Sequence, residues 1–140
     1  MPHPDSTPRL RFRLPATKPH VGAARERVRD AVKDWGIDKD LSASLIQVVS
    51  ELATNAVIHC QVTEALFQVN VYQVNGSFFL EVSDPDGDHS PKLRNATDEE
   101  ENGRGLFLVD LLATEWGTRP GRTVGKTVWA RFDSMEEVAA

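Results

Sequence analysis

The sequence predicts a single α/β domain, and three observations lead to that prediction. Apolar residues recur every three or four positions between about residues 20 and 60, which is the helical period. From Ala65 onward apolar and polar residues alternate, which is the period of a half-buried strand. The length of 140 residues suits one ordinary domain and is enough to bury a core. The two long helices should therefore precede most of the strands along the chain.

The first half of the chain divides into a strand and two helices. Arginine and apolar residues alternate from Arg9 to Leu14, as in a half-buried strand. A helix is expected from about His20 to Trp35, and Gly36 is a natural C-terminal stop for it. Asp40 is placed to cap a second, longer helix that runs to about Cys60. The two helices should be adjacent because the turn between them is short.

The second half predicts a hairpin, a long loop, a short helix and a last strand. Asn75-Gly76 is a strong signal for a two-residue hairpin whose return strand ends at Asp84. Residues 85–102 have no periodicity, and a loop that long in so small a domain is expected to be disordered or functional, often as a lid. A short helix should follow, with its buried side formed by Leu106, Val109, Leu112 and Ala113. A turn-rich connection through Gly117, Pro120 and Gly121 then leads to a strand from Thr127 to Phe132.

Composition excludes several functional classes. The net charge of −5 disfavours direct nucleic-acid binding, although residues 1–35 carry eight Lys or Arg against four Asp or Glu. The arginines of the first strand could face RNA, but an ordinary solvated face or a protein-contact surface is favoured because no outward aromatic residue accompanies them. One cysteine and four scattered histidines predict neither a disulfide nor a zinc site. Without a signal region or an apolar run of about 18 residues, we expect a cytoplasmic protein with no membrane contact.

Three polar residues near the end of the long helix are the first candidates for a ligand site. Glu51, Asn55 and His59 are spaced by four, so they lie on one side of the helix, one turn apart. A carboxylate, an amide and an imidazole in this arrangement can face a single ligand. The same spacing is also typical of a plain solvated face, so the pattern needs support from elsewhere in the chain.

The second candidate is Asp84, at the end of the hairpin's return strand. The aspartates at 84, 86 and 88 resemble a calcium loop, but an EF-hand needs glycine and glutamate where this chain has His89 and Asn95. Two interpretations remain open. The segment is either a plain turn or a strand end whose carboxylate accepts a hydrogen bond from a buried ligand amine.

The third candidate is Gly103-Arg104-Gly105, directly before the short helix. Glycines let the backbone approach a ligand, and free N–H groups at a helix start favour phosphate oxygens. A Rossmann fingerprint would need a third glycine at Leu108. Gly125-Lys126-Thr127 is not a P-loop, because Pro120 replaces the required glycine and a strand follows. A glycine-rich helix entry without a ligand remains the alternative.

Taken together and in this order, the motifs resemble the GHKL superfamily of ATP-binding domains, most closely the bacterial anti-sigma-factor serine/threonine kinases. The resemblance covers roughly Leu10 to Phe132. It rests on four segments, each weak alone and specific in combination: Val49–Val57 as the N box, Val82–Asp84 and Gly103–Val109 as the glycine boxes, and Gly125–Ala130 as the closing strand.

The resemblance implies a two-layer α/β sandwich, with a mixed, mostly antiparallel sheet, helices on one face and the nucleotide between the layers. It places the ATP-binding kinase domain at residues 9–132, between a disordered N-terminus at 1–8 and a frayed tail at 133–140. It further implies ATP and Mg²⁺ as cofactors. The expected partners are a sigma factor and a STAS-type anti-anti-sigma antagonist, and a homodimer is plausible in this family.

The resemblance also implies a role for each candidate residue. Asn55 would coordinate the Mg²⁺ that bridges the phosphates, and Glu51 would act as the general base. Asp84 would accept from the adenine amino group, with help from Thr127. The remaining nucleotide contacts would come from Gly87 and from the run Gly103, Arg104, Gly105 and Leu106, beneath a lid formed by residues 86–102.

One departure from the family pattern bears on activity. Many members carry glycines two and four residues after the adenine-binding aspartate, where this chain has Asp86 and Asp88. Carboxylates so near a triphosphate would repel it unless they face solvent or share the metal. A non-catalytic regulator, gated by nucleotide or independent of it, is therefore an alternative to the kinase. The ATPase part of a two-component histidine kinase is disfavoured because 140 residues leave no room for a phosphoacceptor-helix domain.

Overall fold

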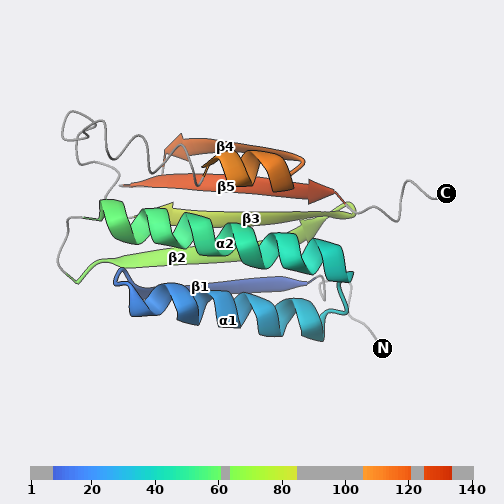
Figure 1. Ribbon diagram of the computed structural model, residues 1–140, viewed down its shortest axis with the longest axis horizontal. Coiled ribbons are helices and arrows are strands. Elements are labelled where there is room, and N and C mark those ends of the chain that lie inside the picture. The colour runs from blue at the N-terminus through green and yellow to red at the C-terminus, as the bar shows by residue number, and fades with distance from the viewer. Residues whose placement is uncertain (1–7, 61–63, 85–105, 121–124, 134–140) are drawn as a thin grey trace.

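The computed structural model describes residues 8–60, 64–84, 106–120 and 125–133. In these residues two long helices cover one face of a five-stranded sheet, so the predicted two-layer α/β architecture is confirmed (Figure 1). Residues 106–112 form a further short helical segment near the far edge of the sheet. The labelled elements are β1 (Arg9–Pro15), α1 (Pro19–Asp34), α2 (Lys39–His59), β2 (Leu66–Val74), β3 (Ser77–Asp84), β4 (Glu115–Pro120) and β5 (Lys126–Asp133).

The sheet has the strand order β1-β2-β3-β5-β4. Each pair of neighbouring strands in that order is antiparallel, so no parallel component occurs among the described strands. The predicted hairpin joins β2 to β3, with φ of 50° at Asn75 and 85° at Gly76. Positive φ at both central residues is what a two-residue turn of the primed type requires. This turn fixes the register in which Val82 lies opposite Val69.

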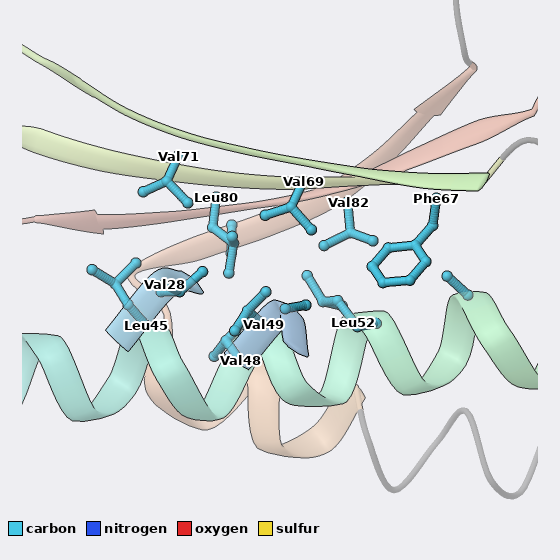
Figure 2. Packing of buried hydrophobic residues seen from close by; sticks show 14 of the residues in the cluster. Val28, Leu45, Val48, Val49, Leu52, Phe67, Val69, Val71, Leu80 and Val82 are labelled. Atoms are coloured by element: carbon cyan, nitrogen blue, oxygen red, sulfur yellow. The ribbon is translucent and has the colours of Figure 1, made fainter. Parts of the chain in front are cut away.

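The core lies between the helices and the sheet, as Figure 2 shows. Leu45, Val49 and Leu52 of α2 pack toward buried side chains of β2 and β3, and Val28 joins them from α1. By length and mean hydropathy α2 could cross a membrane. Six of its apolar residues, however, are buried against the sheet and α1, which accounts for much of its apolar composition. The buried residues of α2 are Leu45, Val48, Val49, Leu52, Ala53 and Ala56.

The start of α2 differs from the sequence-based expectation. The N-cap is Asp38, whose carboxylate accepts a hydrogen bond from the backbone N–H of Leu41. Asp40, the expected cap, lies inside the first turn, where its negative charge favours the positive end of the helix dipole. Gly36 has a φ of 69° and follows the C-cap of α1, as expected for a helix stop.

The expected turn-rich connection after the short helix is wrong, because Glu115–Pro120 is the edge strand β4. Pro120 is tolerated there because it is the last residue of an edge strand. Gly117 makes room for the neighbouring strand's indole, since a Cβ at this position would lie 2.9 Å from Cζ2 of Trp129. Glycine and proline, which usually indicate turns, therefore have packing and edge roles here.

The short helical segment packs as predicted, with Val109 buried and Leu106, Leu112 and Ala113 packed against the core, while Phe107 and Leu111 are exposed. The N-terminus before Pro8, the expected lid at 86–102, Gly121 and the tail after Asp133 lie outside the described residues.

Candidate functional site

A cavity of about 550 Å³ opens between the C-terminal half of α2 and the sheet. This volume lies in the range of pockets that hold cofactors and other small ligands. Its walls are mostly apolar and come from α2, from three strands and from the short helical segment. The apolar lining residues are Leu52, Ala56, Val82, Leu106, Trp116 and Val128.

Polar side chains enter the cavity from both layers. Asn55 and His59 project from successive turns of α2, as their spacing predicts. Asp84 and Lys126 enter from the sheet, and Thr118 adds a hydroxyl from β4. Asp84 is only 8% exposed. The amide of Asn55 and the carboxylate of Asp84, far apart in the sequence, thus line one cavity, as the sequence analysis expected.

Strand register explains how Asp84 and Lys126 come to line the cavity. Asp84 ends β3 and Lys126 begins β5, and the two residues are partners across this antiparallel pair. The partners two residues further into the sheet, Val82 and Val128, also line the cavity. Because side chains alternate along a strand, these four residues share the face that the helices cover.

Thr127 occupies a different place from the one its predicted role requires. Its hydroxyl lies 2.9 Å from the hydroxyl of Ser83, its partner on β3, and both residues alternate with the cavity-lining ones. Thr127 is buried but does not line the cavity, whereas Lys126 does. A contribution of Thr127 to ligand binding stays a prediction.

Glu51 lies on α2 one turn before Asn55 and is partly buried, but it is not among the lining residues of the cavity. Its neighbour Ser50 accepts a 2.9 Å hydrogen bond from Arg25 of α1, which ties the two helices together beside Glu51. Leu106 lines the cavity, as expected. Gly87, Gly103, Arg104 and Gly105 lie outside the described residues.

The described residues contain no cluster of three His, Cys, Asp or Glu side chains that could hold a metal ion. The amide oxygen of Asn55 is a hard donor of the kind Mg²⁺ accepts. Mg²⁺ usually keeps few protein ligands and completes its octahedron with water and phosphate oxygens. Asn55 therefore fits a magnesium ion that arrives with a phosphate ligand.

The opposite face of the sheet carries a buried carboxylate. Glu81 of β3 accepts hydrogen bonds from the Tyr72 hydroxyl and the Asn70 amide, and Arg119 of β4 lies 2.9 Å away in an ion pair. Burial alone would raise the pKa of Glu81, but these three donors outweigh it and hold the pKa below its usual value. Burial and the Glu81 carboxylate raise the pKa of Tyr72 to about 12.

Several lining residues were not predicted. Lys126 belongs to the rejected P-loop and to the closing-strand segment but was assigned no role, although it alternates in step with Val128 and Ala130, which the sequence placed on one face of the last strand. Trp116 and Thr118 could not be found, because β4 itself was expected to be a turn.

Comparison with known proteins gives one family match. The sequence model of the family described as the histidine kinase-like ATPase domain matches residues 14–132. No curated protein matches the chain in a sequence search.

Several solved structures share the fold, among them the following two. The RsbU and RsbW domains of Rv1364c from Mycobacterium tuberculosis align with a TM-score of 0.71 and 23% identity, covering 91% of this chain and 32% of that chain. The SiaB-SiaC complex from Pseudomonas aeruginosa contains a chain that aligns with a TM-score of 0.67 and 13% identity, covering 88% of both chains. The present chain thus spans about a third of the mycobacterial one.

Proposed function

Because this chain belongs to the family of histidine kinase-like ATPase domains, we propose that it is an ATP-dependent protein serine/threonine kinase that acts as an anti-sigma factor. The observation that carries the proposal is that Asn55 and Asp84 line one cavity from opposite layers. An amide on a helix and a carboxylate at a strand end can serve the two ends of a nucleotide, the phosphates with their metal and the base.

In the proposed complex the base lies near Asp84, whose carboxylate accepts a hydrogen bond from the adenine amino group. The apolar side chains of Ala56, Val82 and Val128 provide the dry walls that a purine ring needs. Asn55 holds the Mg²⁺ that accompanies the phosphates. When bound, Mg²⁺ neutralises the negative charge of the transferred phosphoryl group.

The transfer step requires a base near the phosphate end of the site. Glu51 takes the proton of a serine or threonine hydroxyl on the partner protein, and the hydroxyl oxygen attacks the γ-phosphorus. The bond from the γ-phosphorus to the bridging oxygen breaks, and ADP leaves with the electron pair. Glu51 lies one turn from Asn55 on the same helix, which supports its use near the metal.

The proposed protein partners are a sigma factor and a STAS-type anti-anti-sigma antagonist, with the kinase itself a cytoplasmic homodimer. The chain from Pseudomonas aeruginosa that shares this fold was crystallised in a SiaB-SiaC complex, which supports assembly with a partner. The exposed arginines Arg9, Arg11 and Arg13 on the edge strand β1 offer a basic surface for such contacts.

A second candidate function is a non-catalytic regulator whose partner contacts are gated by nucleotide. It is favoured by the position of Glu51, which does not line the cavity. In this alternative Asn55 and Asp84 still bind nucleotide, and no phosphoryl group moves.

The experiment that separates these functions incubates the full chain with Mg-ATP and a STAS-type antagonist protein, and identifies any phosphorylated residue by mass spectrometry. We expect phosphoserine or phosphothreonine on the antagonist. Glu51→Gln should keep ATP binding and abolish transfer, while the exposed control Glu26→Gln should transfer at the wild-type rate. ATP binding without any transfer would establish the regulator instead. Phosphohistidine on the acceptor would indicate the histidine-kinase type of reaction.

A further inference from the structure

The cavity contains a cation that the proposed function does not use. Lys126 is half-buried, and among the described lining residues it is the only lysine or arginine. It is the cross-strand partner of Asp84. Directly opposed residues on one face of an antiparallel pair have Cβ atoms about 5 Å apart. An ammonium group and a carboxylate therefore enter the same cavity side by side.

A carboxylate alone would make this end of the cavity selective. The 6-position of adenine carries an amino group, which donates to a carboxylate. Guanine and hypoxanthine carry a carbonyl oxygen at the same position, which can only accept. A site whose polar groups cannot pair with an incoming ligand rejects that ligand, because both partners lose their hydrogen bonds to water. Asp84 alone can still pair with N1–H of a 6-oxopurine, but without a neighbouring donor O6 would lose its hydrogen bonds to water unreplaced, which disfavours 6-oxopurine nucleotides.

We propose that Lys126 is a specificity-determining residue that lets the cavity accept 6-oxopurine nucleotides as well as ATP. The inference rests on the proposed function, in which the base lies beside Asp84. With guanine, the Lys126 ammonium donates to O6, and the Asp84 carboxylate accepts from N1–H and the 2-amino group. With adenine, the carboxylate accepts from the 6-amino group, and the base makes no contact that requires the ammonium.

The surroundings of the pair strengthen its effect. The next cross-strand partners, Val82 and Val128, are apolar and line the same cavity. Charge-assisted hydrogen bonds are stronger beside apolar walls than in water. Thr127 cannot supply the missing donor in place of Lys126, since its side chain is on the other face of β5 with Ser83.

The test is a set of calorimetric titrations with Mg-ATP, Mg-GTP and Mg-ITP. ITP tests the contact to O6 without the 2-amino group, because hypoxanthine lacks that group but keeps O6 and N1–H. We expect the unmodified protein to bind all three within about tenfold of one another. Lys126→Met should keep ATP affinity within a few-fold while its affinity for GTP and ITP falls by about 10- to 100-fold. Lys126→Arg should retain affinity for all three nucleotides. The control Lys33→Met, which replaces an exposed lysine on α1, should change none of the three affinities.

The outcomes separate this inference from the proposed function. ATP binding with exclusion of GTP and ITP by the unmodified protein would overturn the role of Lys126 and leave the ATP site intact. An equal loss for all three nucleotides in Lys126→Met would also overturn it, by placing the ammonium at the phosphates. No binding of any nucleotide by the unmodified protein would overturn both proposals. If Lys126→Met does not fold, Lys126→Val, which suits a strand and carries no donor, answers the same question.

Discussion

The Tyr72 hydroxyl donates a 2.7 Å hydrogen bond to Oε2 of Glu81, across the β2–β3 hairpin and on the face of the sheet that α1 and α2 leave uncovered. Arg119 reaches the same oxygen from β4, over the intervening strand β5. The Tyr72 ring also stacks on Phe79, with centroids 5.3 Å apart. Glu81 therefore connects the edge strand β4 to the middle of the sheet, and its ionisation state should affect stability.

Acid should weaken the fold through Glu81. Its hydrogen-bonded carboxylate has a pKa below the usual value, so the stabilisation is present above the unfolded-state pKa of about 4.3 and is lost as pH falls through the folded-state pKa. The free energy of unfolding, measured with urea, should therefore fall less between pH 7 and pH 3 in Glu81→Gln than in the unmodified protein. The exposed control Asp30→Asn should lose as much stability as the unmodified protein does. Identical losses in all three proteins would contradict the role of Glu81.

Tyr72 gives an independent spectroscopic test, because it is the only tyrosine in the sequence. A free tyrosine ionises at pH ~10, and its phenolate absorbs at ~295 nm. The absorbance of Tyr72 at this wavelength should instead titrate with a midpoint of about 12. The raised pKa means that its contribution to stability is complete below about pH 10 and is lost as pH rises through the folded-state value. In Glu81→Gln the midpoint should move toward the ordinary value. A midpoint that does not move would show that burial alone sets the pKa.

Removal of the Phe67 side chain should leave a cavity beside α2. Phe67 is fully buried at 0% exposure and points from β2 into the core (Figure 2). Phe67→Ala should lower the free energy of unfolding by about 3–5 kcal/mol. The adjacent Leu66 is 45% exposed, and Leu66→Ala should change the free energy of unfolding by no more than about 0.5 kcal/mol. Chemical denaturation of the two variants measures both effects, and similar values for both would contradict the observed facing of β2.

Thr127 distinguishes the sequence-based site from the one seen in the structure. Because its hydroxyl pairs with Ser83 away from the cavity, Thr127→Val should cost about 1 kcal/mol of stability and leave ATP affinity unchanged. Unfolding experiments and Mg-ATP titrations measure the two quantities on the same protein. A large loss of ATP affinity would restore the predicted role of Thr127 in adenine binding.

The parts of the fold that could be predicted are those with local signals. The Asn75-Gly76 pair predicts the hairpin because a two-residue turn of the primed type requires positive φ at both positions, and both residues have it in the structure. The strand β4 was missed because Gly117 and Pro120 usually indicate turns, and its pairing with β5 depends on tertiary contacts. Asp38 was passed over as a cap because Asp40 carries the same side chain two residues later.

The residues of the candidate site also divide into those with a local sequence signal and those that depend on tertiary contacts. Asn55 came from helical spacing, and Asp84 came from its position at a strand end. Trp116 and Thr118 reach the cavity only through the unpredicted strand β4. Alternation with Val128 and Ala130 already indicates that Lys126, not Thr127, shares their face of β5, and the register with β3 then places Lys126 opposite Asp84.

The most direct test of the central claim is a calorimetric titration of Mg-ATP into the unmodified protein, Asn55→Ala and Asp84→Asn. Both substituted residues line the cavity, one from the helical layer and one from the sheet. We expect the unmodified protein to bind one ATP per chain, and each variant to lose at least about tenfold in affinity, as expected for the loss of a hydrogen bond to a charged group. Wild-type affinity in both variants would contradict a nucleotide site between α2 and the sheet.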